Sequence, residues 1–290
     1  MPSKPRTLRS AADSEVLTRA ESDELERARK RLGKRGGGPG SVRSARPRAS
    51  RGSGDGAVAA LTFFVGACVA TFLFLENPYL GSFEAYRLIN CTLLFWVPYL
   101  VITLGMKLDV DQFGLTRGDA QAGRTYVVVA LVLMIPVLVI ASLWPTFRHW
   151  YGDSLAQPLA LVGYAVRPGW TPAVRPLGLL YYEMGQGFYF FCWEFFFRGF
   201  LLFGLARVRW LGSVGAVIVQ ALAFMLLHWS LVPSAAKPPQ EIASALVGGV
   251  LLGVLALKTR TFFYGFVIHW VIAAAFDLLI AGALLIHPLS

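Results

Sequence analysis

Long apolar runs separated by short polar links recur along this chain from residue 57 onward. A helix that spans a membrane needs about 20 mostly apolar residues. Seven runs come near or exceed that length, and the last is long enough to break in two around Asp277. The runs are Ala57–Leu75, Leu88–Gly105, Thr125–Trp144, Gly178–Leu205, Gly212–Leu231, Ile242–Leu257 and Phe262–Ile286. The pattern predicts an all-α, polytopic membrane helix bundle of seven or eight transmembrane helices.

Composition supports this prediction. Apolar residues make up 56% of the 290 residues and charged residues 15%, whereas soluble domains carry about 25% charged residues. The mean hydropathy is +0.56. Cys68, Cys91 and Cys192 each lie in an apolar run, and no CxxC pair is present. These cysteines are therefore expected to be small buried residues, not a disulfide framework or a metal site.

Residues 1–56 differ from the rest of the chain in composition. They hold 14 Lys and Arg against 7 Asp and Glu, and the stretch RLGKRGGGPGSVRSARPRASRGSGDG is rich in Gly, Arg and Ser. Such a segment cannot bury enough apolar surface to offset its ordering entropy. We predict a disordered basic tail that is attracted to anionic lipid headgroups, and we do not expect nucleic acid as its partner.

The remaining Lys and Arg residues predict the orientation of the chain. With seven spans, the links on the same side as the tail are the richer in basic residues: Lys107, Arg117, Arg124, Arg207, Arg209, Lys258 and Arg260. Cytoplasmic loops carry this excess, so we predict an integral multi-pass protein of the plasma (cytoplasmic) membrane with a cytoplasmic N-terminus. Residues 57–177 are interpreted as scaffold helices with a long interfacial loop, and residues 178–286 as the functional core.

Ionisable residues inside the spans are candidates for function, because each is costly in a membrane unless it is paired. All of them lie in the C-terminal half: Glu183, Glu194, Arg198, His228, His269 and Asp277. Glu194 and Arg198 are four residues apart and share a helix face. Phe224 and His228 have the same spacing on the next predicted span.

A glutamate, two histidines and an arginine from three helices could converge on one water molecule. A buried carboxylate can act as a general base, and imidazoles can hold the water or stabilise an oxyanion. This is the machinery of peptide hydrolysis by water. Glu194, His228 and His269 are also a set of zinc ligands, although they lack the HExxH spacing. The sequence requires no cofactor and leaves a divalent metal such as zinc open.

Three motifs resemble the CPBP family of intramembrane proteases, the CAAX protease and bacteriocin-processing (Abi) proteins. They are WEFFFR at residues 193–198, FMLLH at residues 224–228 and HWVIA at residues 269–273. The resemblance implies an intramembrane endopeptidase, of glutamic or metallo type, that acts on a membrane or lipid-proximal protein. It also implies catalytic roles for Glu194, His228 and His269, with Arg198 and Phe224 in support.

The chain departs from the family pattern at two positions. Trp193 stands where the family has the first glutamate of a pair, and Ala273 stands at the Asn or Asp of the third motif. Glu183 and Asp277 are candidate substitutes. These departures keep a second interpretation open, a catalytically inactive CPBP-like binding or scaffold protein. A small proton-coupled transporter is the third, although no inverted repeat is visible.

Overall fold

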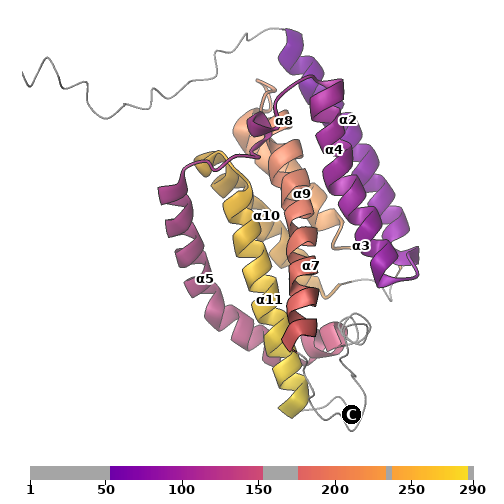
Figure 1. Ribbon diagram of the computed structural model, residues 1–290, viewed down its shortest axis with the longest axis vertical. Coiled ribbons are helices and arrows are strands. Elements are labelled where there is room, and N and C mark those ends of the chain that lie inside the picture. Colours follow the sequence, from indigo (N-terminus) through magenta and orange to yellow (C-terminus); the bar gives the residue numbers. More distant parts are fainter. Residues whose placement is uncertain (1–52, 153–175, 233–236, 287–290) are drawn as a thin grey trace, which may run out of the picture. The chain divides into compact units, whose positions relative to one another are not determined.

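A computed structural model of the chain describes residues 53–152, 176–232 and 237–286. Within these ranges every regular element is a helix, and six helices are long and apolar enough to cross a membrane (Figure 1). These candidate spans are Gly54–Tyr79, Glu84–Gly105, Ala120–Leu143, Tyr182–Leu205, Pro239–Thr259 and Phe263–Ile280. The prediction of an all-α, polytopic membrane helix bundle is confirmed. Of the predicted tail at residues 1–56, residues 1–52 lie outside the described residues, whereas residues 53–56 form the first turn of the helix Ser53–Glu76 and are not disordered.

The helices follow one another in a simple order. They are α2 (Ser53–Glu76), α3 (Phe83–Cys91), α4 (Val97–Leu100), α5 (Ala120–Leu143), α7 (Pro176–Glu194), α8 (Leu202–Leu205), α9 (Gly212–Leu226), α10 (Pro239–Thr259) and α11 (Phe263–Ile286). Turns of π-helix, η2 (Thr92–Trp96), η3 (Val101–Gly105) and η5 (Phe195–Leu201), lie within the helical runs, and η1 (Asn77–Tyr79) and η4 (Val110–Phe113) are 3₁₀ turns. Because α7, η5 and α8 are continuous, we call residues Pro176–Leu205 the central helix.

The central helix is much more buried than the other spans. Of its most apolar window 72% is buried, against 33% or less in each of the other five spans. Every residue from Cys192 to Leu202 is buried. The four phenylalanines in this stretch, Phe195, Phe196, Phe197 and Phe200, are all 0% exposed. The aromatic run therefore forms the core of the bundle and does not face lipid.

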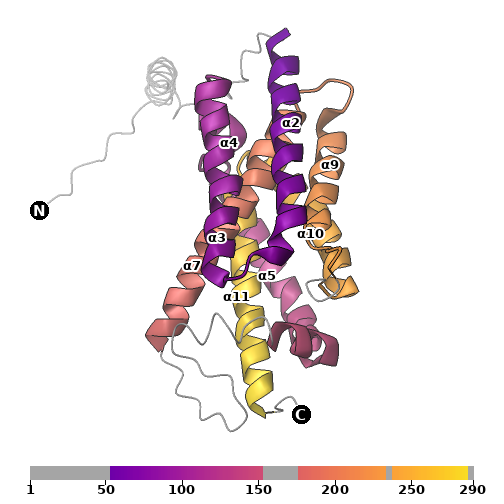
Figure 2. The same cartoon turned by 90° about the vertical axis from the view of Figure 1, so that its right-hand side faces the viewer.

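Five other helices of the described part pack against the central helix. They are α2, α3, α9, α10 and α11, while α5 lies outside them along α11 (Figures 1 and 2). The approach of α2 is close, because a Cβ atom at Gly204 would lie only 2.3 Å from Thr62 Oγ1. This packing places the middle of the central helix, where Glu194 lies, in the interior of the bundle.

Two predicted spans differ in the structure. α9 ends at Leu226 instead of Leu231, so its 15 residues rise only about 22 Å, less than the roughly 30 Å of a hydrocarbon core. The helix ends because the backbone tightens into a turn, in which His228 N donates to Met225 O and Trp229 N to Leu226 O. α11 continues through Asp277 without a break, so the described residues do not support the alternative of eight helices.

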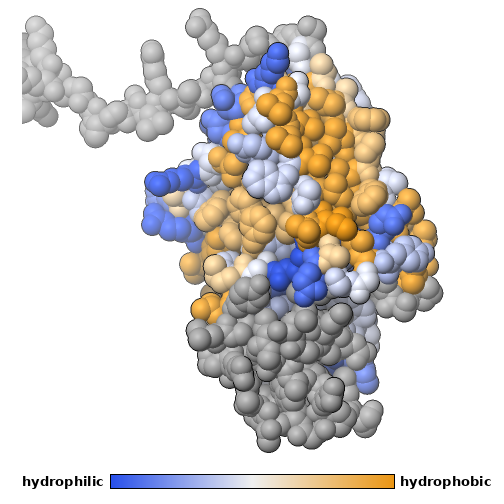
Figure 3. All heavy atoms as spheres, turned by 45° about the vertical axis from the view of Figure 1, so that its right-hand side comes forward, coloured by the Kyte–Doolittle hydropathy of each residue, from blue (hydrophilic) through white to orange (hydrophobic). Residues whose placement is uncertain are grey.

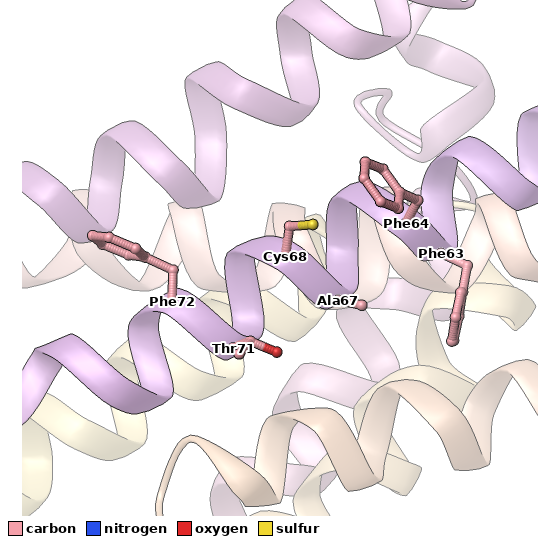
Figure 4. Close-up of a pocket in the computed structure, with 6 residues that line it drawn as sticks. All are labelled: Phe63, Phe64, Ala67, Cys68, Thr71 and Phe72. Atoms are coloured by element: carbon pink, nitrogen blue, oxygen red, sulfur yellow. The ribbon is translucent and has the colours of Figure 1, made fainter.

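The outer surface of the described part is apolar over a large area. Figure 3 shows apolar side chains covering much of one face, with hydrophilic side chains toward its margins. Only 6% of the most apolar window of α5 is buried, as suits a helix in contact with lipid. A shallow hollow on α2 is lined by Phe63, Phe64, Ala67, Cys68, Thr71 and Phe72 (Figure 4). All six residues belong to one helix, and none of the candidate catalytic residues is among them.

Candidate active site

Glu194 is the centre of a buried polar cluster in the central helix. Its side chain is 0% exposed, and its Oε1 atom lies 2.8 Å from His269 Nδ1 of α11 and 3.1 Å from Arg198 Nη1. Arg198 follows within the π-helical turn η5 and is also fully buried. Removing one partner of a buried ion pair leaves an uncompensated charge. The contact between the two side chains therefore explains how the apolar interior accommodates both of them.

The guanidinium of Arg198 lies on an aromatic ring. Its Cζ atom is 4.0 Å from the centroid of Phe224 on α9 and 5.8 Å from that of Phe197. A cation over the face of a ring is attracted by the ring quadrupole, and the attraction strengthens where water is excluded. Phe224 thus holds the guanidinium in place beside Glu194, and it ties α9 to the central helix at the site.

His228 follows the end of α9 and meets the cluster through aromatic rings. Its Nδ1 atom bonds the backbone oxygen of Phe224 at 2.9 Å. Its ring lies 4.6 Å from the Phe224 ring and 5.9 Å from the Trp193 ring, centroid to centroid, and the Phe224 ring lies 5.9 Å from that of His269. Phe224 therefore packs against both imidazoles, and no hydrogen bond between His228 and Glu194 occurs among the described residues.

The hydrogen bonds indicate where the imidazole protons are. A carbonyl oxygen and an ionised carboxylate only accept hydrogen bonds. Nδ1 of His228 therefore donates to Phe224 O, and Nδ1 of His269 donates to Glu194 Oε1. In the neutral form, the Nε2 atom of each ring keeps a lone pair. In both histidines, Nε2 is therefore the nitrogen that can accept a hydrogen bond or a proton from a further group, such as a water molecule.

Several buried polar atoms of the cluster have no hydrogen-bond partner among the described residues. They are Glu194 Oε2, the Nε, Nη1 and Nη2 atoms of Arg198, and Trp193 Nε1. Nη1 is in ionic contact with Glu194 but is poorly aligned for a hydrogen bond. An unpaired buried group costs about 1–3 kcal/mol, and buried waters commonly satisfy such groups. Free acceptor and donor atoms in one cluster therefore mark a place for a water molecule or a substrate oxygen.

Gly265 of α11 faces the buried Oε2 atom of Glu194. A Cβ atom at this position would lie 3.2 Å from Oε2 and 3.8 Å from Leu252 Cβ. Gly265 precedes His269 by four residues, so both residues lie on the same face of α11. The two oxygens of Glu194 therefore have different surroundings on α11: Oε1 bonds the imidazole, and Oε2 faces a position without a side chain.

The described residues do not form a ready metal site. No group of three or more His, Cys, Asp or Glu side chains among them is placed to hold an ion. A zinc ligand must lie about 2.0–2.2 Å from the metal, whereas Glu194 Oε1 is already occupied by the Nδ1–H group of His269. Glu194, His228 and His269 would have to rearrange to share a metal. The sequence required no cofactor and left a divalent metal such as zinc open, and chelation can test this alternative to direct activation of water by Glu194.

Glu183 and Asp277 lie apart from this cluster. Glu183 is eleven residues before Glu194, about 16 Å along the helix axis. Both of its carboxylate oxygens are buried without a partner, and its backbone oxygen accepts a hydrogen bond from Trp270 Nε1 at 3.0 Å. Asp277 lies eight residues after His269 on α11, about 12 Å along the helix axis. Both acids are therefore too far along their helices to supply a second carboxylate beside Glu194.

Phe224 was expected at the site, but the contributions of Gly265, Phe190 and Trp193 were not foreseen from the sequence. Phe190 packs against His269 with 4.4 Å between ring centroids, and Trp193 packs against Phe224 at 5.7 Å. The spacing of four residues between Gly265 and His269 is a signal that could have placed the glycine at the site. The spacing of four residues indicates the contact of Phe224 with His228, but no spacing indicates that Phe190 contacts His269.

Fold and site together define a polytopic helical membrane protein whose most buried helix carries a Glu–Arg pair bonded to a histidine of another helix. Residues 179–275 match the family described as type II CAAX prenyl endopeptidase Rce1-like. The resemblance to CPBP proteases is thereby confirmed over this segment, which includes Glu194, Arg198, Phe224, His228 and His269 and ends before Asp277. Comparison with curated proteins gave no match, and comparison with solved structures gave none either.

Proposed function

We propose that the protein is an intramembrane endopeptidase that hydrolyses a peptide bond of a membrane or lipid-proximal protein with a water molecule activated by Glu194. The observation that carries the proposal is the difference between the two oxygens of one buried carboxylate. Oε1 bonds His269 and contacts Arg198, while Oε2 is buried and has no partner. The match of residues 179–275 to a family of endopeptidases supports this function.

The proposed mechanism uses groups of the protein alone. Oε2 of Glu194 accepts a proton from water, and the water oxygen attacks the carbonyl carbon of the scissile bond. The Nε2 atoms of neutral His228 and His269 accept hydrogen bonds from the water, a protonated imidazole donates to the oxyanion that forms, and the unpaired N–H groups of Arg198 add positive potential beside it. Glu194 then gives the proton to the leaving amine, which restores the carboxylate.

The family description names a CAAX prenyl endopeptidase, but we assign no residue described above to the recognition of a prenyl group. For this chain we propose that the substrate is a membrane-associated protein, and we assign no cleavage site in it. We also propose that the protein resides in the plasma membrane with a cytoplasmic N-terminus, and that its basic tail contacts anionic lipid headgroups.

The test compares three forms of the full chain in lipid vesicles. The probes are quenched fluorescent peptides, one a farnesylated CAAX peptide and the others unmodified transmembrane segments. Wild type and Glu84→Gln, a change at an exposed acid in the first turn of α3, should cleave at least one probe at the same rate. Glu194→Gln should abolish cleavage of that probe while the protein stays folded. Full activity of Glu194→Gln would refute the proposal.

A second candidate is an inactive binding protein built on the same helices. The observation that favours it is Trp193, which fills the position of the family's first glutamate with a buried ring packed on Phe224 and His228. This alternative predicts that neither wild type nor Glu194→Gln cleaves any probe. It also predicts that N-terminal peptide profiling of native membranes detects no new peptide ends when the protein is expressed.

A further inference from the structure

Two of the three cysteines, Cys91 and Cys192, belong to the same hydrophobic cluster, whereas the sequence predicted small buried residues and no disulfide framework. Cys91 is the last residue of α3 and is partly exposed, and Cys192 on α7 is fully buried. The third, Cys68, is exposed on α2, where its neighbours in Figure 4 are apolar side chains and Thr71. The chain therefore contains one thiol pair and one single thiol.

Contacts before and after the two cysteines show how the two helical segments are aligned along each other. The Tyr86 and Tyr189 hydroxyl oxygens lie 2.9 Å apart on one side, and the Phe95 and Phe195 rings lie 5.0 Å apart on the other. Because residue numbers rise together in these contacts, the two helices run in the same direction there. Position 91 then falls opposite position 192, and both cysteines belong to one hydrophobic cluster, in which Cys91 packs against the buried residues that include Cys192.

We propose that Cys91 and Cys192 form a disulfide by exchange with a disulfide-containing compound, which makes this pair a modification site of the protein. The Cys91 thiolate attacks the compound and releases one of its halves as a thiol, which leaves a mixed disulfide on Cys91. The Cys192 thiolate then attacks the Cys91 sulfur and releases the second half as a thiol. One disulfide is reduced to two thiols, and two protein thiols are oxidised to one disulfide.

Burial sets the order of these two steps. Cys91 is the partly exposed member of the pair, so it meets the reagent first, whereas Cys192 is reached through Cys91. The resulting bond joins the scaffold helix α3 to the central helix two residues before Glu194. It would close a loop of roughly 100 residues, and such a link constrains the unfolded chain. The inference does not depend on the proposed protease activity.

The experiment uses the reduced, full-length protein in detergent with 2,2′-dithiodipyridine, a small apolar disulfide. Each attack by a thiolate releases one thiopyridone, which is measured by absorbance, and mass spectrometry locates the remaining adducts. Wild type should release three equivalents and keep a single adduct, on Cys68. Its peptides should include Cys91 linked to Cys192.

Two variants make this result specific. In Cys192→Ser, the protein should release two equivalents and keep adducts on both Cys68 and Cys91. In Cys91→Ser, it should release one equivalent, from Cys68, because the buried Cys192 has lost its partner. A wild-type protein that keeps an adduct on Cys91 while Cys192 stays a free thiol would overturn the proposal. So would a linked peptide that contains Cys68 in place of Cys91 or Cys192.

Discussion

His269 Nδ1 of α11 lies 2.8 Å from Glu194 Oε1 of the central helix, so two residues that are 75 positions apart in the sequence meet at one carboxylate. The same oxygen contacts Arg198 at 3.1 Å. Because the histidine and the arginine bind the same oxygen, the second oxygen is left free. Because the two oxygens have different neighbours, mutations can test the residues beside Oε1 separately from the residue beside Oε2.

The first prediction concerns His269. His269→Ala should lower cleavage of a peptide probe by about 10²–10⁴-fold, the range for losing a general acid–base group, because Glu194 loses its hydrogen bond on α11 and the attacking water loses the Nε2 acceptor. The measurement is the initial cleavage rate in lipid vesicles. His149→Ala is the matched control, since His149 follows α5 and is not part of the cluster, and it should cleave at the wild-type rate. Equal rates for His269→Ala and wild type would contradict the role of His269.

The second prediction concerns the buried ion pair. Arg198→Met should lower the free energy of unfolding by about 3–5 kcal/mol, since it leaves the Glu194 carboxylate uncompensated in the interior. The double variant Glu194→Gln with Arg198→Met should recover much of this loss, because it removes both charges. Denaturant unfolding in detergent measures both values. If the double variant is less stable than Arg198→Met, the stabilising effect does not come from pairing of the charges.

The apolar runs predicted most of the fold, because hydropathy and length alone decide which helices can cross a membrane. The spacing of Glu194 and Arg198 likewise predicted a contact that the structure contains. The end of α9 at Leu226 was not predictable, because the following residues through Leu231 remain largely apolar while the backbone already turns. The π-helical turn at Phe195–Leu201 has no hydropathy signal either, yet it carries Arg198.

The pairing of polar residues across helices was only partly predictable. The family motifs indicated that Glu194, His228 and His269 belong to one site, but not that His228 contacts it through the ring of Phe224. Spacing on a single helix also suggested that Glu183 shares a stripe with Glu194. The rise of the helix nevertheless separates the two acids, and Glu183 lies with Trp270 and Tyr182 instead. Contacts between helices depend on rotation and depth, which a single sequence does not encode in its periodicity.

The third prediction concerns Phe224. Phe224→Leu keeps a bulky apolar residue but removes the ring under Arg198, so it should lower stability by roughly 1–3 kcal/mol from the cation–π contact and the ring packing together. It should also lower the cleavage rate, because Arg198 and both histidines lose a common support. Phe63→Leu is the control, since Phe63 is 59% exposed on α2. Thermal unfolding and cleavage are measured on the same samples. An unchanged cleavage rate for Phe224→Leu would contradict the role of the Phe224 ring in supporting the catalytic residues.

The fourth prediction concerns metal dependence. If Glu194 activates water directly, prolonged treatment with a chelator such as 1,10-phenanthroline should leave cleavage unchanged, because no step requires an ion. Residual zinc is measured in the same sample by mass spectrometry to show that chelation is complete. Loss of cleavage that returns when zinc is added would instead support coordination by Glu194, His228 and His269. In that case these side chains must move from the arrangement described here, since Glu194 Oε1 now bonds a protonated Nδ1 atom.

The fifth prediction concerns the space beside Glu194 Oε2. Gly265→Ala would place a methyl group 3.2 Å from this oxygen, where it hinders the approach of water or a peptide carbonyl. Helix propensity favours alanine over glycine by about 1 kcal/mol, so the variant should unfold no more easily than wild type. The cleavage rate should nevertheless fall by at least about tenfold, which corresponds to 1.4 kcal/mol in the barrier. Gly248→Ala is the control, since nothing lies within 4 Å of a Cβ atom at that position, and it should gain the same helix propensity at the wild-type cleavage rate. If both variants cleave like wild type, Oε2 does not meet its water on the side of α11, and the base must act from another direction.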